Sequence, residues 1–204
     1  MLIDLRYLVK KYNVNITGII HVGAHECEEM DIYNKCGVKD DSIIWIEADS
    51  DTYTRMNGKI KNLYNVVISD KDNEVREFNV TNNNQSSSLL NLKTHLIAHP
   101  TIHVINKKFV TTKTLDTFFS DENIDITKYN FLNIDIQGAE LLALKGMSKS
   151  LHNMDYLYLE VNTEELYENC AMVNEIDQFV SVYGFKRIET KMTGVGWGDA
   201  FYIK

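Results

Sequence analysis

The chain has 204 residues, of which 44% are hydrophobic and 25% charged, a balance typical of a folded globular protein and not of a disordered segment. The formal net charge of −8 argues against nucleic acid as a partner, because a phosphate backbone would be repelled over most of the surface. The length fits a single α/β domain over residues 1–204.

Neither a membrane span nor a secretory signal is expected. No stretch approaches the roughly 18 consecutive apolar residues that a span requires, and the N-terminus carries charges inside its apolar pattern. The three cysteines, Cys27, Cys36 and Cys170, have no metal-type spacing and cannot all pair. We therefore expect a cytoplasmic protein with free thiols.

The first part of the chain alternates between strand and helix patterns. An amphipathic helix is predicted over residues 2–12, within an N-terminal segment of residues 1–15. It is followed by strands at 16–22, 43–46 and 66–68, separated by helices at 27–36 and 49–62. Strands that alternate with helices predict a mostly parallel sheet with helices on both faces.

Residues 75–113 depart from this alternation, with extended patterns at 75–80 and 107–112 around a polar loop, Asn82–Ser88. We interpret this segment as an insertion over the acceptor side of the sheet. Alternation then resumes, with elements predicted as a helix at 115–119, a strand at 129–134, a helix at 139–149, a strand at 156–161, a helix at 173–183 and a terminal hairpin of 185–188 with 200–203.

Polar residues follow each predicted parallel strand. In an open α/β sheet, ligands bind beyond the carboxyl ends of the strands, so these residues are candidates for a site. They are His21 to His25, Glu47, Ser69 and Asp70, Asp135 to Gly138, and Glu160 to Asn162.

Gly23 and Glu47 have the spacing of a nucleoside site. Gly23 lets a ligand approach the backbone, the helix after it favours an anionic group, and an acid about 24 residues later can accept hydrogen bonds from ribose hydroxyls. The alternative is that Gly23 only makes a turn and Glu47 is a solvated strand end.

The ordered motifs resemble the FkbM-type methyltransferases over residues 17–204. The resemblance rests on "HVGAHEC", "WIEADS", "SDK" with "NNNQSSSLL", "TLDTF", "FLNIDIQGAELLALKG", "YLYLEVNTEELYENC" and "GFKRIETKMTGVGWGDAFYIK". It implies a Rossmann-like class I methyltransferase fold with a seven-stranded sheet and an antiparallel C-terminal strand. It also implies methyl transfer from S-adenosylmethionine, most often to a hydroxyl of a sugar or glycoconjugate.

The same resemblance assigns roles to site residues. It implies that Gly23, Ala24 and His25 face the methionine part of the cofactor, that Glu47 holds the ribose, that Ser69 and Asp70 lie near the adenine, and that Asp135 lies close to the methyl group. His21 stands where the family more often has an acid that bonds the cofactor ammonium. A neutral imidazole has one acceptor nitrogen for that purpose, and a protonated imidazole has none.

Two further positions depart from the family pattern. Cys27 replaces a more frequent glycine and His25 a frequent asparagine. The loss of the glycine would harm a pyrophosphate ligand more than S-adenosylmethionine, which needs no such close approach of the backbone.

A sugar hydroxyl has a high pKa, so methyl transfer to it calls for a base or a metal. Asp135 is the first candidate base, with His25 second and Glu160 third; the alternative role for Asp135 is to cap the next helix at Ala139 or to position the cofactor. Glu140 is expected to stabilise the first turn of its helix. Asp135, Glu140 and Glu160 could together hold magnesium, although a divalent metal is not favoured.

Other polar and aromatic groups suit an acceptor groove. His95, His99 and His103 are spaced by four, but Pro100 breaks the helix that would align them as metal ligands, so we interpret them as scattered surface or groove histidines. Trp197 could stack on a sugar face or simply pack.

The leading hypothesis is therefore an S-adenosylmethionine-dependent O-methyltransferase acting on a saccharide. A non-catalytic Rossmann-like module with a weakened cofactor site, serving a larger assembly, is the alternative. A nicotinamide oxidoreductase is disfavoured by the missing glycines. The sequence specifies neither the sugar nor the oligomeric state.

Overall fold

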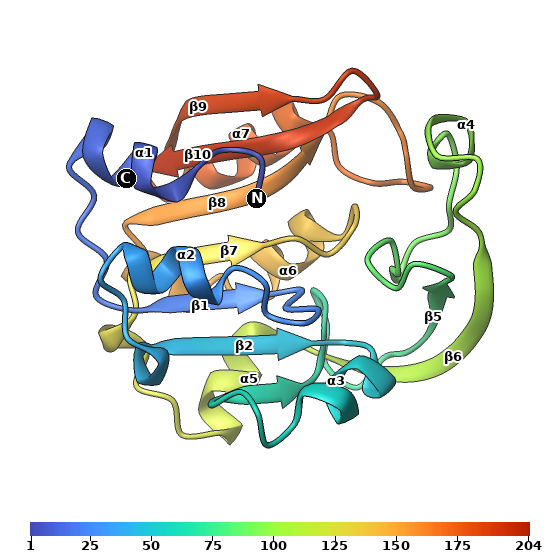
Figure 1. Ribbon diagram of the computed structural model, residues 1–204, viewed down its shortest axis with the longest axis horizontal. Helices are drawn as coiled ribbons and strands as arrows, with labels where there is room; N and C mark the ends of the chain where they lie inside the picture. Colours follow the sequence, from blue (N-terminus) through green and yellow to red (C-terminus); the bar gives the residue numbers. More distant parts are fainter.

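The computed structural model describes residues 1–204. Seven strands form its main sheet: β1 (Ile19–Val22), β2 (Ile43–Glu47), β3 (Leu63–Asn65), β7 (Phe131–Ile134), β8 (Tyr156–Asn162), β9 (Lys186–Met192) and β10 (Trp197–Ile203). Their order across the sheet is β3-β2-β1-β7-β8-β10-β9 (Figure 1). The pairs β2·β3, β1·β2, β1·β7 and β7·β8 are parallel, whereas β10 runs antiparallel to both β8 and β9. The predicted Rossmann-like sheet with an antiparallel C-terminal strand is confirmed.

Helices cover both faces of this sheet (Figure 1). The first three lie on one face and share a core with it: α1 (Leu5–Tyr12), α2 (Met30–Lys35) and α3 (Ser50–Met56). The last three pack against the other face: α5 (Leu115–Asp121), α6 (Glu140–Lys145) and α7 (Val173–Ser181). Short 3₁₀ helices lie at Asp40–Ser42, Ile126–Lys128 and Ser150–Asn153. Every residue of β1, β2 and β7 is buried, as expected for parallel strands covered on both sides.

The insertion forms a second, three-stranded sheet of β4 (Val67–Ile68), β5 (Val75–Thr81) and β6 (Val104–Lys113), in the order β4-β6-β5. Strands β5 and β6 form an antiparallel pair, and the long connection between them contains α4 (His95–Ala98). Figure 1 shows β5, β6 and α4 beyond the carboxyl ends of β1 and β2. The structure therefore places the insertion over the predicted edge of the sheet.

The prediction for the third strand is wrong by a few residues. The strand that joins the main sheet is Leu63–Asn65, whereas Val67 and Ile68 pair in parallel with β6 of the second sheet. The apolar run at 66–68 was the stronger strand signal, but its side chains are buried by the insertion. A hydrophobic run shows that a segment is buried and does not show which sheet buries it.

Several helices are shorter than their sequence patterns predicted. Helix α2 begins at Met30 and not at position 27, because His25 and Cys27 adopt left-handed backbone conformations, with φ of 43° and 59°. These φ values exclude both residues from a right-handed helix. They also explain why asparagine and glycine are suited to these two positions. None of the helices is long and apolar enough to cross a membrane.

Candidate active site

Two adjoining cavities lie at the carboxyl edge of the main sheet. The smaller has a volume of about 580 Å³ and is lined by residues of the β1, β2 and β7 ends, of Val66–Ile68 and of the insertion. The larger, of about 1100 Å³, lies between the loop after β1, the end of β8 and the segment around α4. Both cavities are lined by Gly23, His25, Gln85, Asp135 and Gln137, so together they form one cleft.

The first N–H groups of the loop after β1 are bonded within the protein, so they are not free to bind an anion. The N–H groups of Gly23 and Ala24 both donate to the carbonyl of Ile46, at 2.9 and 3.0 Å. The N–H of His25 donates to Glu47 and that of Cys27 to Ala24. Because the loop satisfies its own donors, it suits a ligand without a phosphate at this point.

Gly23 is required by close packing of the backbone. Its φ is +90°, and a Cβ at this position would lie 1.8 Å from the carbonyl oxygen of Asp135. The end of β1 therefore touches the end of β7, which no side chain other than hydrogen allows. Gly23 makes this contact and at the same time lines both cavities.

Glu47 is buried, so the alternative of a solvated strand end is wrong. Its Oε2 accepts the N–H of His25 at 2.6 Å and its Oε1 accepts the N–H of Asp49 at 2.7 Å. Burial raises the pKa of this carboxyl above its ordinary value, while the two N–H donors oppose the rise. A carboxylate has about four acceptor sites, and these bonds leave the others to the cavity that Glu47 lines.

Apolar side chains form the wall of the smaller cavity opposite Glu47. They include Val66, Val67, Ile68, Phe78 and Leu89. Ser69 and Asp70, which the family resemblance places near the adenine, line neither cavity. The Ser69 hydroxyl instead donates to Asp70 at 3.2 Å. Their role stays a prediction, and the apolar wall is a feature that the strand-end pattern had missed.

Gln137 links the two carboxyl groups at the floor of the cleft. Its side-chain amide nitrogen lies 2.7 Å from Asp135 Oδ1 and 2.5 Å from Glu160 Oε2, and its amide oxygen accepts the Tyr167 hydroxyl at 2.6 Å. Burial, followed by the neighbouring Asp135 carboxylate, raises the pKa of Glu160 well above its usual range. The buried Glu160 therefore favours its protonated form, while Asp135 is half-buried and lines both cavities.

Asp135 does not cap the helix that follows it, so the capping role is wrong, whereas a role in positioning the cofactor stays a prediction. Helix α6 begins without any side-chain cap, and the acid that supports its entry is Glu140, as expected. Glu140 Oε1 accepts the N–H groups of Ile136 and Gly138 at 3.0 and 3.1 Å. Burial raises the pKa of Glu140 to about 7.

No group of three or more His, Cys, Asp or Glu side chains is arranged to hold a metal ion. The magnesium site considered for Asp135, Glu140 and Glu160 is therefore not formed, because Glu140 serves the backbone of the loop and Glu160 is bonded to Gln137.

His21 lies at the base of the larger cavity with its ring held by two neighbours. The Asn133 amide donates to the Tyr33 hydroxyl at 2.7 Å, so the hydroxyl keeps its own proton for His21 Nδ1, 3.0 Å away. Burial lowers the pKa of His21, which favours the neutral ring. The hydrogen-bond network then assigns the proton of the ring to Nε2. The one acceptor nitrogen expected for the cofactor ammonium is already occupied.

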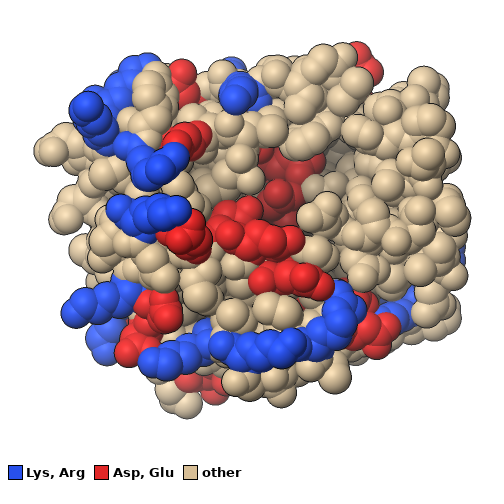
Figure 2. Space-filling model, viewed as in Figure 1, with Lys and Arg blue, Asp and Glu red and all other residues tan.

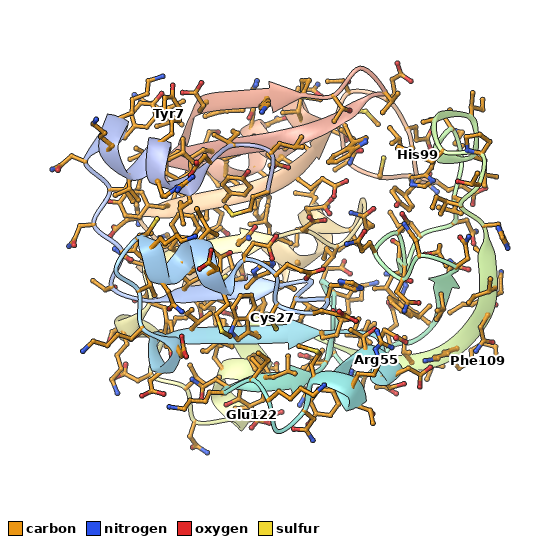
Figure 3. All side chains as sticks on the ribbon, viewed as in Figure 1. Tyr7, Cys27, Arg55, His99, Phe109 and Glu122 are labelled. Atoms are coloured by element: carbon orange, nitrogen blue, oxygen red, sulfur yellow. The ribbon has the colours of Figure 1, made fainter.

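The insertion contributes histidines and polar side chains to the cleft. His95 and His99 line the larger cavity with ring centroids 4.9 Å apart, whereas His103 is exposed and bonded to the backbone of the insertion. Figure 3 shows His99 on the side of the insertion that faces the sheet and Phe109 on its outer side. Residues from the Asn82–Ser88 loop line both cavities, and Trp197 lines the larger.

The family model of the methyltransferase FkbM domain matches residues 21–187. The chain belongs to the FkbM methyltransferase family. Among solved structures, it is similar to a SAM-dependent methyltransferase from Aquifex aeolicus, with 12% identity, a TM-score of 0.49, and coverage of 99% of this chain and 90% of that chain. A search among curated proteins found no match.

As a member of this family, the protein is an S-adenosylmethionine-dependent methyltransferase. The cleft suits that cofactor, because a buried carboxylate faces an apolar wall in the smaller cavity and acidic side chains surround the larger one. The nucleoside has two hydroxyl donors and a flat apolar base, and the methionine end has a net positive sulfonium and ammonium pair. The nucleoside groups therefore match the smaller cavity, and the positive groups of the methionine end match the larger, acidic cavity.

Proposed function

We propose that the protein transfers a methyl group from S-adenosylmethionine to a hydroxyl oxygen of a sugar or glycoconjugate. The observation that carries this proposal is the position of Asp135, which lines both cavities and is held by Gln137. A base where the two cavities join can contact the acceptor hydroxyl close to the expected position of the cofactor's methyl group. Hydroxyl-rich acceptors also suit the neutral donors and acceptors that the Asn82–Ser88 loop provides.

In this proposal, residues of the chain bind the cofactor, align the acceptor hydroxyl with its methyl group and remove the proton of that hydroxyl. Glu47 accepts hydrogen bonds from the ribose, the wall of Val66, Val67 and Ile68 contacts the adenine, and Gly23, Ala24 and His25 border the methionine end. S-adenosylmethionine supplies an electrophilic methyl group with an excellent leaving group. The protein's main contribution is then alignment, together with acceptance of the hydroxyl proton.

Asp135 is the proposed base, and the raised pKa of Glu160 supports this choice. A protonated Glu160 cannot accept the proton of the hydroxyl, whereas it can share the Gln137 amide with Asp135 and fix its orientation. We assign Glu160 and Gln137 as positioning residues. His25 is the second candidate, and its ring is bonded to Glu28 at 2.6 Å.

The test is a transfer assay with S-adenosylmethionine labelled with ¹³C in the methyl group, using a mixture of mono- and disaccharides. NMR of the products identifies whether the labelled carbon is bonded to oxygen, nitrogen or sulfur. The expected result is a labelled methyl ether. Transfer only to nitrogen or sulfur, or no transfer by protein that binds the cofactor, contradicts the proposal.

The alternative, a non-catalytic module with a weakened cofactor site, is favoured by one observation. His21 offers an N–H where a group that accepts from the cofactor ammonium is more frequent. Against it, the larger cavity is also lined by Glu28, Glu29 and Asp135, which can take over the contact with the ammonium.

A further inference from the structure

Acidic side chains line the cleft without any lysine or arginine side chain to balance them; His25 and the amino group of Met1, which also line it, are paired with Glu28 and Glu29. The larger cavity is lined by the carboxylates of Glu28, Glu29 and Asp135 and by Glu160, whose raised pKa favours the neutral form, and the smaller cavity is lined by Glu47 and Asp135. No lysine or arginine lines either cavity. Figure 2 shows the acidic side chains in and around the hollow at the middle of this face, with the basic ones at its margins.

We infer that the acceptor of this enzyme is a saccharide without phosphate or carboxylate groups, and that nucleotide sugars, sugar phosphates and uronates are excluded by charge. This inference rests on the proposed function and names its substrate class. Low-dielectric walls concentrate the field of their charges inside a cleft, so a second anion is repelled there more strongly than at an open surface.

The groups that normally hold anions are absent from the cleft or already bonded. The loop after β1 uses the N–H groups of Gly23, Ala24 and His25 internally. The positive amino group of Met1, which lines the larger cavity, is 3.4 Å from Glu29. Apart from the Met1 amino group, the cleft therefore offers a diphosphate or carboxylate of the acceptor none of the lysine or arginine donors that bind such groups in proteins.

Basic residues at the margin of the cleft are held by other acids. Lys108 lies 2.7 Å from Asp49 and 3.0 Å from Asp51, and Arg55 lies 3.2 Å from Glu26. Turning either side chain into the cleft would break these ion pairs. In the structure these pairs hold both cations outside the two cavities.

The polar groups that remain are suited to neutral hydroxyls. His95 is 5% exposed, lines the larger cavity, and its Nδ1 has no hydrogen-bond partner in the protein. Burial lowers the pKa of His95 to about 4, with a smaller contribution from the nearby His99. The ring of His95 is therefore neutral at physiological pH. A neutral imidazole nitrogen can bond a hydroxyl, and the half-buried ring of Trp197 in the same cavity offers an apolar face for a sugar.

The test compares hexuronates with their hexuronamides, which match in size and differ in charge. Methyl transfer is measured for gluco, galacto and manno pairs at low ionic strength. We expect kcat/KM for the amide to exceed that for the acid by about tenfold or more, and the ratio to fall as salt screens the charges. Equal or better use of the acid overturns the inference but leaves the proposed function intact.

Two variants test whether the preference for the amide over the acid arises from the charges that line the cleft. The double variant Glu28→Gln/Glu29→Gln removes two lining charges and is expected to reduce the ratio by at least about threefold, because each unit charge contributes to the repulsion. Glu122→Gln is the matched control, since Glu122 is exposed, directly follows α5 and lies away from the carboxyl ends of β1 and β2 (Figure 3). An unchanged ratio in the double variant, or an equal change in the control, overturns the inference.

If neither member of any acid–amide pair is methylated, measurement of sugar binding tests the inference independently of the proposed function. Trp45 is fully buried and Trp197 lines the cavity, so Trp197 fluorescence reports sugar binding to protein loaded with S-adenosylhomocysteine, and the signal must disappear in Trp197→Phe. Binding of amides without binding of acids supports the inference. Binding of acids, or of neither member of any pair, overturns it.

Discussion

The backbone N–H of His25 donates to the Glu47 carboxylate across 2.6 Å and thereby joins the loop after β1 to the end of β2. The same carboxylate accepts the N–H of Asp49, which begins the approach to α3. Glu47 thus fixes two backbone segments while its remaining acceptor sites face the smaller cavity. With Glu47 in its proposed role as the ribose acceptor, cofactor binding and the geometry of this loop are coupled through one side chain.

Replacement of Glu47 by alanine is expected to weaken binding of S-adenosylmethionine more than it lowers kcat. The variant loses the ribose acceptor and leaves the two N–H donors unpaired, which corresponds to roughly 1–3 kcal/mol, or about five- to 150-fold in Kd. Calorimetric titration measures the Kd, and thermal unfolding shows that the variant is folded. The control is Glu122→Ala at an exposed position. A Kd equal to that of the unchanged protein would remove Glu47 from the cofactor site.

Replacement of Asp135 by asparagine is expected to lower turnover with little effect on cofactor affinity. The amide keeps the size of the side chain but cannot take the hydroxyl proton, so we expect kcat to fall by roughly 10²- to 10⁴-fold. Steady-state kinetics on an identified acceptor measures this, with Asp121→Asn as the control at an exposed surface position. Unchanged kcat in the Asp135 variant would exclude it as the base and leave His25 as the next candidate.

His21 is expected to remain neutral well below the ordinary pKa of histidine, with its proton on Nε2. Burial lowers its pKa, and the Tyr33 hydroxyl 3.0 Å away occupies Nδ1. ¹⁵N NMR of labelled histidine identifies the tautomer and its titration directly. In Tyr33→Phe the donor to Nδ1 is lost, so a mixture of tautomers is expected. A ring that protonates near pH 6.5, or a proton on Nδ1 in the unchanged protein, contradicts the network.

The buried Glu140 predicts a pH dependence of stability. Burial raises the pKa of this carboxyl to about 7, above the roughly 4.3 of an unfolded glutamate. Its contribution to the free energy of unfolding is therefore fully present below pH ~4.3 and is lost as the pH rises to about 7. In Glu140→Gln the side-chain oxygen still accepts the N–H groups of Ile136 and Gly138 but does not ionise.

We therefore expect Glu140→Gln to gain stability relative to the unchanged protein between pH 4.5 and 7.5, by on the order of 1–3 kcal/mol. Urea unfolding at both pH values measures the difference. If the two proteins differ by the same amount at each pH, the burial of an ionisable Glu140 does not cause the effect.

The sequence predicted the order of elements well because parallel strands here are short apolar runs bounded by polar residues. It misplaced the third strand, since Val66–Ile68 and Leu63–Asn65 are adjacent and only the more apolar run gave a signal. It also extended α2 back to residue 27, because a left-handed φ at His25 or Cys27 cannot be read from residue type with certainty.

The strand-end pattern found the residues of the cleft but not how they are connected. Asp135 and Glu160 both line the larger cavity as the pattern suggested, whereas their link through Gln137 depends on a left-handed conformation at that residue, with φ of 58°. The one local hint of this link in the sequence was a polar residue, Gln137, directly after "NIDI". The occupied acceptor of His21 depends on Tyr33 and Asn133, which lie in other elements and are not predictable from local sequence.

The most direct test of S-adenosylmethionine use is a calorimetric titration of the folded protein with S-adenosylmethionine, S-adenosylhomocysteine and NAD. We expect saturable binding of both sulfur ligands at one site, weakened by Glu47→Ala, and no binding of NAD. Absence of heat with both sulfur ligands, in protein shown to be folded, contradicts the assignment of the cleft as a cofactor site.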